Sequence, residues 1–185
     1  MGLYLIQIAR YLVGETGKVV VSCSARNHEL VKKYGADEAV DYTSVKLPSY
    51  LSQQYAATRF DLVVDAVGSF ELFYACAAFL KPRGDYLLMA LDFPSTLGGF
   101  VSTFVNLVRS CLLPAFLGGV PRRLKLSLLN FNGETMQNVG RLIDQKQIRP
   151  VLDSIWEFND QGIRDAYTKI MTHHARGKVV IKVSD

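Results

Sequence analysis

Short, largely apolar runs alternate with longer segments of helical apolar spacing along most of this 185-residue chain. The runs lie at 18–23, 39–42, 60–65 and 86–89. Strands separated by helices in this way predict a mostly parallel sheet with helices on its faces, joined by right-handed crossovers. The valine-rich run at 18–23 is typical of a strand buried on both faces of such a sheet. We therefore expect an α/β protein.

Capping residues and glycines predict where the helices begin and end. Asn27 is expected to cap a helix that Gly35 ends, and Ser69 to cap a helix that runs to residue 80. The Pro-Arg-Gly triplet at 82–84 then predicts a turn into the strand at 86–89.

The second half of the chain loosens beyond residue 91 and then regains its pattern. Asn132 and Asp160 are expected to cap two further helices, the first with Met136, Val139 and Ile143 on its inner face. The remaining strands are predicted at 125–131, within 148–158 and at 178–183.

Composition excludes several classes of protein. The chain is 49% hydrophobic, which is too apolar for disorder, and its net charge of +4 is spread without a basic block, which argues against nucleic-acid binding. Its three cysteines are odd in number and widely spaced, as expected of reduced thiols in a cytoplasmic protein. The histidines lack the spacing of a metal site, so no metal is predicted.

The apolar stretch at 100–120 raises the question of a membrane. Asn106, Arg109 and Pro114 interrupt it, and a central arginine is costly inside a bilayer. We expect no span here, but a helix that could contact a membrane surface or a partner.

The chain opens on Gly2 and runs directly into a helix, where Leu3, Ile6 and Ala9 have helical apolar spacing. In a nucleotide-binding βαβ unit, a glycine-rich turn between a buried strand and the first helix holds the pyrophosphate. Gly2 is the last glycine such a turn would contain, so we expect a strand and turn to be missing upstream. The alternative is a plain amphipathic helix.

An ordered set of residues resembles a known family. The set comprises Gly2, the valine-rich strand ending in Ser24-Ala25-Arg26-Asn27, the stretch from Leu30-Val31-Lys32-Lys33 through Gly35-Ala36-Asp37 to Asp41-Tyr42, the strand at 60–65 followed by Gly68, and Arg176-Gly177-Lys178. It resembles the zinc-free quinone oxidoreductase-like branch of the medium-chain dehydrogenase/reductase superfamily. The resemblance covers nearly the whole chain.

The resemblance implies a Rossmann-type, doubly wound, mostly parallel sheet that lacks its first strand and the GroES-like N-terminal domain. Residues 1–155 would form the N-terminally truncated nucleotide-binding domain, and 156–185 a helix and strand returning to the absent catalytic domain. Family members often pair through this half, which leaves a homodimer open.

Residues after the valine-rich strand bear on the choice of nicotinamide cofactor. A carboxylate at this place would accept hydrogen bonds from the ribose 2′-hydroxyl, whereas this chain has Ser24, Arg26 and Asn27. These donors favour NADPH over NADH, since Arg26 can bind a 2′-phosphate in a bidentate way. The alternative is a helix cap at Asn27 beside a solvated Arg26.

Further cofactor contacts follow from the resemblance and from positions at strand ends. Tyr42 matches a tyrosine beside the adenosine phosphate, and Lys178 matches a basic position near the family's C-terminus. Val67, Gly68 and Leu91 follow strands at the edge where open α/β sheets hold ligands. Each has a structural alternative: a half-buried aromatic for Tyr42, turn residues at the strand ends, and an exposed charge for Lys178.

Two functions remain open at this point. The first is an NADPH-dependent oxidoreductase that transfers hydride to a quinone or a conjugated carbonyl substrate, with this chain as its cofactor-binding half and no single catalytic residue. The second is a non-catalytic truncated product or interaction module that binds a partner or a membrane surface through 100–120.

Overall fold

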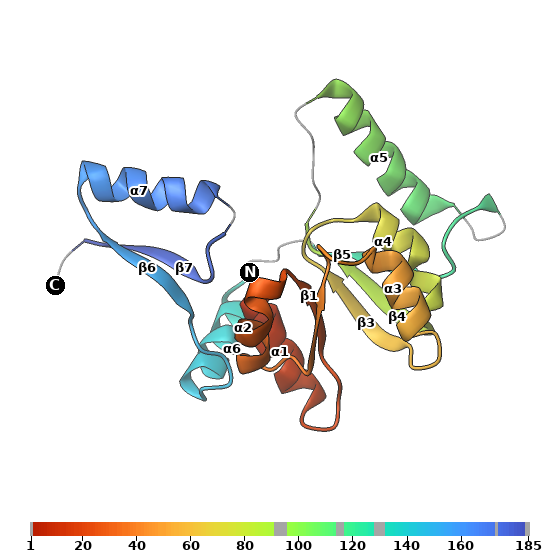
Figure 1. The fold of residues 1–185 in the computed structure, drawn as a ribbon, viewed down its shortest axis with the longest axis horizontal. Helices are drawn as coiled ribbons and strands as arrows, with labels where there is room; N and C mark the ends of the chain where they lie inside the picture. The colour runs from red at the N-terminus through yellow and green to blue at the C-terminus, as the bar shows by residue number, and fades with distance from the viewer. Residues whose placement is uncertain (1, 91–95, 114–116, 128–131, 173, 184–185) are drawn as a thin grey trace. The chain divides into compact units, whose positions relative to one another are not determined.

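The computed structural model describes residues 2–90, 96–113, 117–127, 132–172 and 174–183, without the side chains of Leu97 and Cys111. Helices and strands alternate along the chain (Figure 1). The chain divides into two compact units, which we call the terminal unit (Met1–Val40 with Phe131–Asp185) and the central unit (Asp41–Asn130).

The terminal unit is formed by residues from both ends of the chain. Its core contains Ile6 of α1 together with Val19, Val31 and Ala36. Strand β1 pairs with β2, and β6 pairs with β7 in parallel, with α7 packed over that pair (Figure 1). The elements are α1 (Gly2–Val13), β1 (Val20–Cys23), a 3-10 turn (Ala25–Asn27), α2 (His28–Lys33), β2 (Glu38–Asp41), α6 (Gly133–Asp144), β6 (Leu152–Glu157), α7 (Asp160–Met171) and β7 (Lys178–Lys182).

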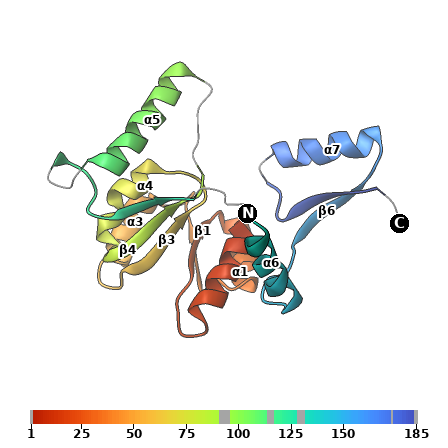
Figure 2. The same ribbon diagram turned by 180° about the vertical axis from the view of Figure 1, so that it is seen from behind.

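The central unit is built on a parallel three-stranded sheet in the order β3-β4-β5. Phe73, Phe79 and Tyr86 are almost completely buried in its core, and the rings of Phe73 and Tyr86 meet edge to face at 5.1 Å. Helices α3 and α4 lie side by side against this sheet (Figure 2). The elements are α3 (Leu47–Gln54), β3 (Phe60–Asp65), α4 (Phe70–Ala75), a 3-10 turn (Cys76–Ala78), β4 (Leu80–Leu88), α5 (Leu97–Leu112) and β5 (Arg123–Leu126).

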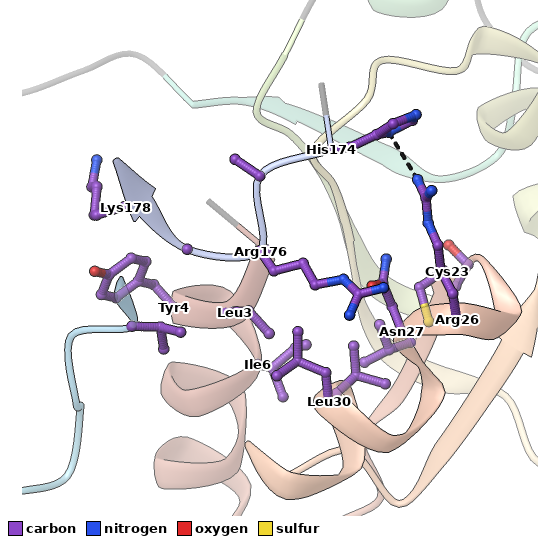
Figure 3. A pocket seen from close by; sticks show the side chains of 17 residues that line it. Leu3, Tyr4, Ile6, Cys23, Arg26, Asn27, Leu30, His174, Arg176 and Lys178 are labelled. Carbon is purple, nitrogen blue, oxygen red and sulfur yellow. Dashed lines mark hydrogen bonds between the residues drawn. The ribbon is translucent and has the colours of Figure 1, made fainter. Parts of the chain in front are cut away.

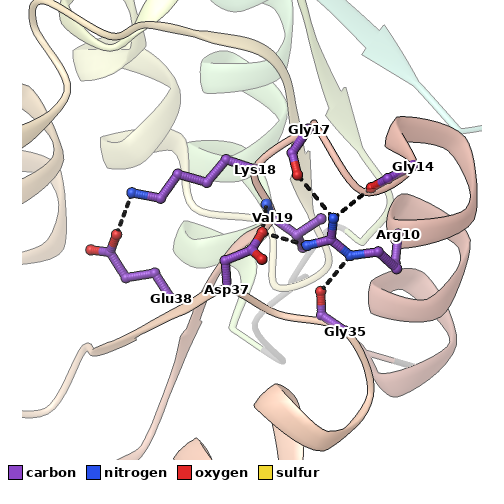
Figure 4. A network of polar contacts seen from close by, with 8 residues as sticks. All are labelled: Arg10, Gly14, Gly17, Lys18, Val19, Gly35, Asp37 and Glu38. Carbon is purple, nitrogen blue, oxygen red and sulfur yellow. Dashed lines mark hydrogen bonds and ion pairs between the residues drawn. The ribbon is translucent and has the colours of Figure 1, made fainter.

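Arg10 connects the loop after α1 with the loop after α2 through hydrogen bonds in the terminal unit (Figure 4). Its guanidinium donates to the carbonyl oxygens of Gly35 at 3.1 Å, Gly14 at 2.6 Å and Gly17 at 2.9 Å, and it pairs with Asp37. The Asp37 carboxylate also accepts the Val19 N–H at 2.7 Å. This N–H bond and the Arg10 charge hold the pKa of Asp37 below its usual range.

The predicted turn at 82–84 is wrong, because these residues belong to β4. Phe60 pairs with Leu80 and Leu62 with Asp85, so residues 81–84 stand opposite Asp61 alone. The Pro-Arg-Gly triplet thus lies within β4, where it forms an irregularity in the pairing with β3. The preceding helix correspondingly ends at Ala75, earlier than residue 80.

Two of the four predicted helix caps are confirmed. The Ser69 hydroxyl accepts the Leu72 N–H at 3.2 Å, and Asn132 Oδ1 accepts the Thr135 N–H at 2.7 Å. Asp160 is wrong as a cap, because Asn159 Oδ1 takes the Gly162 N–H at 2.8 Å.

Asn27 stands before α2, but its side chain does not cap the helix. A 3-10 turn precedes α2, so the Asn27 backbone is already helical and its side chain does not reach the next amides. Its Nδ2 donates instead to Ser24 Oγ at 3.3 Å. Gly35 has the positive φ, 111°, expected of the residue that ends this helix.

Burial departs from prediction in β1 and α6. Ser22 is exposed, so β1 is not buried on both faces; in the part of the chain that the structure describes, β1 pairs with β2 alone. The predicted inner face of α6 is also exposed, by 53% at Met136, 41% at Val139 and 39% at Ile143. The apolar periodicity thus predicted the helix correctly, but not the exposure of its apolar face.

Helix α5 lies in the stretch that raised the question of a membrane. Tyr74 of α4 donates to Asn106 at 3.0 Å, and the Arg109 guanidinium lies 5.1 Å from the Tyr74 ring centroid. No helix within the described ranges has the length and apolar character that a membrane crossing requires.

Candidate functional site

The terminal unit contains a pocket of about 280 Å³ beside the start of α1 (Figure 3). Three segments far apart in the sequence enclose it: the first turn of α1, the end of β1 with the turn into α2, and the segment that leads into β7. Its lining combines apolar residues, among them Leu3, Ile6 and Leu30, with polar and basic ones.

The start of α1 brings hydrogen-bond donors to this pocket. The first amides of a helix have no partner within the helix, and the helix dipole places a partial positive charge there. Gly2 and Leu3 line the pocket, and a Cβ built on Gly2 would meet no atom within 4 Å. The start of this helix is thus the kind of place where proteins bind anionic groups.

Three cationic side chains, Arg26, Arg176 and Lys178, line the same pocket together with His174. Among the described residues of the lining, none is acidic. Arg26 Nη2 lies 2.8 Å from His174 Nδ1 (Figure 3). Because a guanidinium can only donate, the imidazole nitrogen accepts in this contact. A cationic lining without carboxylates suits a ligand that carries several negative charges.

The segment before β7 is held by its backbone. The Arg176 N–H donates to Asp153 Oδ1 at 2.6 Å, and the Lys178 N–H donates to the Val151 carbonyl at 2.7 Å. A Cβ on Gly177 would lie 2.5 Å from the Val151 oxygen, so only glycine fits between these two residues. The pKa of Asp153 is lowered, first by the Arg176 N–H and then by Lys169. The basic side chains of Arg176 and Lys178 thus start from a fixed backbone.

Four of the predicted cofactor residues line this pocket: Gly2, Arg26, Asn27 and Lys178. Ser24 is adjacent and contacts Asn27, but it is not part of the lining. Asn27 Oδ1 is buried and has no hydrogen-bond partner, which leaves an acceptor for a ligand or a water molecule.

The other predicted residues fall outside the lining. Tyr42, Val67 and Gly68 belong to the central unit, where Tyr42 and Val67 are exposed and Gly68 has a φ of 94°. Leu91 lies outside the described residues.

Residues 66–69, which we call the rim loop, follow β3 and are held by one carboxylate. Asp65 Oδ1 accepts the N–H groups of Val67 at 2.9 Å and Gly68 at 2.8 Å, and its Oδ2 accepts that of Ser69 at 2.8 Å. The positive φ of Gly68 permits this tight reversal.

Sequence reasoning missed His174 and Arg176 as pocket residues. They lie about 150 positions from Arg26, and no local pattern indicates that the two segments meet. The Arg-Gly-Lys triplet at 176–178 was the available signal, but only Lys178 was predicted from it as a cofactor contact. The described residues contain no cluster of side chains that could hold a metal ion.

The fold is that of an α/β protein with parallel sheets, as predicted, and solved structures share it. The quinone oxidoreductase from Coxiella burnetii superposes with a TM-score of 0.68 at 23% identity, over 99% of this chain and 49% of its own. A short-chain alcohol dehydrogenase (rspB) from Escherichia coli, solved in complex with the cofactor NADH, superposes with a TM-score of 0.68 at 18% identity, over 96% of this chain and 48% of its own.

The sequence matches the zinc-binding dehydrogenase family over residues 34–181, and the chain belongs to this family. It is 33% identical to the trans-enoyl reductase poxH of Penicillium oxalicum, over 100% of this chain and 48% of that protein. It is 30% identical to the human mitochondrial NAD(P)H oxidoreductase RTN4IP1, over 99% of this chain and 45% of that protein. The predicted relation to medium-chain reductases is thereby confirmed, and the chain spans about half the length of the curated relatives it matches.

Proposed function

We propose that this chain binds NADPH for an oxidoreductase that transfers hydride to a quinone or an α,β-unsaturated carbonyl compound. The observation that carries the proposal is the pocket at the start of α1, with three cationic side chains and no acidic one among its described lining residues. NADH and NADPH differ by one phosphate, and a pocket of this charge favours the more anionic of the two.

Each lining residue has a role in this proposal. Arg26, at the end of β1, would bind the 2′-phosphate through its planar guanidinium. Gly2, which has no side chain, would leave space for a phosphate near the first amides of α1, while Arg176 and Lys178 add positive charge from the segment that leads into β7. The unpartnered Oδ1 of Asn27 would accept a hydrogen bond from a ribose hydroxyl.

The cofactor, when bound, supplies the hydride, and the protein's part is to hold and orient it. The names of two relatives support this chemistry, since one is a trans-enoyl reductase and another an NAD(P)H oxidoreductase. The division into a nucleotide-binding part, 1–155, and a C-terminal part, 156–185, remains a proposal. So do contacts from Ser24, Tyr42, Val67, Gly68 and Leu91.

One observation favours a second candidate, an interaction module that binds a partner or a membrane surface. Helix α5 exposes a row of large apolar side chains to solvent: Phe100, Val101, Phe104, Val105 and Leu112. A chain that serves only this purpose would bind no nucleotide, so the same binding measurement separates the two candidates.

The test is a titration of the 185-residue chain with NADPH and NADH, followed by nucleotide fluorescence. We expect NADPH to bind at least about tenfold more tightly, because one charge-assisted hydrogen bond is worth a factor of that order. The matched competitors are 2′,5′-ADP and 5′-AMP, which differ only in the 2′-phosphate, and only the first should compete well. Equal affinity for NADPH and NADH would refute the NADPH preference, and binding of neither would refute the proposed function.

A further inference from the structure

Helix α5 is turned the opposite way from an ordinary surface helix. Its more buried positions are mostly small or polar: Gly99, Thr103, Asn106, Leu107 and Ser110. Its large apolar side chains are instead exposed, by 51% at Val101, 55% at Phe104 and 55% at Val105. A surface helix normally directs its apolar side at the core. The exposed side of α5 is therefore suited to contact with another apolar surface.

The polar side of α5 is held by α4, beside which the helix lies (Figures 1 and 2). The Tyr74 hydroxyl donates to Asn106 at 3.0 Å, and the Arg109 guanidinium lies over the same ring. Thr103, on that side, is buried. These contacts fix which side of α5 faces the body of the central unit, so the apolar side is turned to solvent.

The exposed apolar side chains of α5 form one continuous face, which we call the α5 face. It consists of Phe100, Val101, Phe104, Val105, Val108 and Leu112. At about 100° per residue, these positions cover about 140° of the helix circumference. Leu113 and Leu117 are exposed as well and extend the apolar row beyond the end of the helix. The α5 face thus offers apolar contact along the length of the helix.

The segment that carries the α5 face has charges of one sign only. In the sequence, 93–133 contains Arg109, Arg122, Arg123 and Lys125 and no acidic residue. Arg123 and Lys125 pair with Asp85 of β4, whereas Arg109 lies on α5 itself. Arg109 follows Val105 by four residues, which places it at the edge of the α5 face.

This combination of apolar face and cation favours one kind of occupant. Two copies of the α5 face would bring like charges together, which disfavours self-association. An anionic lipid surface accommodates both features, because its acyl chains accept the apolar side chains and its headgroups attract the cation.

We propose that the α5 face docks the protein on an anionic lipid surface, with α5 lying in the plane of the headgroups. Arg109, at the edge of the face, has a side chain long enough to keep its guanidinium among the headgroups while the apolar side chains enter the acyl boundary. The inference goes beyond the proposed function and does not rest on it, because α5 belongs to the central unit and the nucleotide pocket to the terminal unit.

The test measures co-flotation of the 185-residue chain with lipid vesicles. One set contains phosphatidylcholine with phosphatidylserine as the anionic lipid, and the other contains phosphatidylcholine alone. The chain should bind the mixed vesicles at least about fivefold more tightly, since one basic residue at an anionic surface is worth a factor of that order. Raised salt should reduce the difference. Equal affinity for the two kinds of vesicle would overturn the proposal.

Val101→Asp places a carboxylate on the α5 face, where it removes apolar area and meets anionic headgroups. Affinity for the mixed vesicles should fall by at least about tenfold. Val139→Asp is the matched control, because it makes the same change at an exposed valine of α6, and vesicle binding should stay within about twofold. Far-UV circular dichroism checks that both variants keep their helices. Undiminished binding by Val101→Asp would remove the α5 face from the lipid contact.

Arg109→Gln tests the charge separately from the apolar face. Affinity for the mixed vesicles should fall by about fivefold, and affinity for phosphatidylcholine alone should not change. Arg141→Gln in α6 is its control and should change neither. A loss of equal size on both kinds of vesicle would overturn the choice of an anionic lipid surface.

Sedimentation velocity without lipid decides between lipid and a second copy of the chain. We expect Val101→Asp to leave the oligomeric state unchanged. A dimer that this variant dissociates would assign the α5 face to self-association and overturn the proposal. A wild-type chain that binds neither kind of vesicle would also overturn it and leave the face to a protein surface outside this chain. NADPH titration of the same samples is independent: nucleotide binding without vesicle binding refutes only this inference, and the reverse refutes only the proposed function.

Discussion

The pocket of the terminal unit and the rim loop of the central unit offer opposite hydrogen-bonding chemistry. The pocket presents the first amides of α1 and three cationic side chains, with no acidic residue in its described lining. The rim loop follows a strand in the same way, yet Asp65 takes up three of its N–H groups. The difference lies in where a carboxylate stands: its absence leaves donors for a ligand, and its presence leaves acceptors.

In the terminal unit, a side chain of the opposite charge makes similar contacts with the backbone of loops. Arg10 collects three loop carbonyls, whereas Asp65 collects three loop amides. Arg10 is partly exposed and shares its charge with Asp37, while Asp65 is buried and depends on Tyr86. In each unit, one charged side chain thus binds several backbone groups of the neighbouring loops, which the following substitutions test.

Arg26→Glu is expected to have the largest effect. Loss of a charge-assisted bond plus repulsion should weaken NADPH binding by about 100-fold, or about 2.7 kcal/mol, and NADH binding only a few-fold. Fluorescence titration with both nucleotides measures this, with Arg59→Glu in the central unit as a control of the same charge change. Equal losses for the two nucleotides would remove Arg26 from the 2′-phosphate site.

Arg10→Met should lower the free energy of unfolding by about 2 to 3 kcal/mol, because three carbonyls and Asp37 lose a common donor. Urea denaturation gives the value. Lys18→Met removes an exposed ion pair with Glu38 and should cost less than about 0.5 kcal/mol. Similar losses in the two variants would mean that Arg10 is not the centre of this network.

Gly68→Ala should destabilise the chain by about 1 to 2 kcal/mol, since a φ of 94° is strained for a residue with a Cβ. Gly140→Ala is the paired control: a Cβ there meets nothing within 4 Å inside α6, so stability should rise slightly. Affinity for 2′,5′-ADP should be unchanged in both. A stable Gly68→Ala protein would show that the rim loop has another conformation available.

Asp37→Asn should cost about 1 kcal/mol at neutral pH, because the side chain is partly exposed. The folded pKa of Asp37 lies below its ordinary 3.8, so its contribution is complete above that pH and is lost as the pH falls through the folded value. Urea midpoints at pH 7 and pH 3 should therefore differ from wild type more at pH 7, with the exposed Asp144→Asn as control. A gap that widens on acidification would contradict the assignment.

Local chemistry made much of the fold predictable from the sequence. Ser69 and Asn132 cap their helices as expected because a cap depends only on the next three residues. Asn27 and the Pro-Arg-Gly triplet at 82–84 were misjudged because a 3-10 turn and a strand irregularity override local preference. The exposed face of α6 shows that periodicity identifies an apolar face without showing what it packs against.

The candidate site was predictable only in part for a related reason. Gly2, Arg26 and Asn27 follow from the order of strand and helix, and the structure brings them together with Lys178. His174 and Arg176 reach the pocket through tertiary structure, which no local pattern encodes. Asp65 was recognised as the end of a strand, although a carboxylate before a glycine also signals a side chain that binds the next backbone amides.

The two units carry thiols of very different reactivity. Cys23 lines the pocket in the terminal unit and is partly accessible, whereas Cys76 is completely buried in the central unit. Loss of solvent raises the pKa of the Cys76 thiol to about 12, and only the thiolate attacks alkylating reagents. With Cys111 replaced by serine, labelling of Cys76 would time the opening of one unit while Cys23 reports ligand occupancy in the other. Two native thiols can therefore report on the two units separately, without any introduced cysteine.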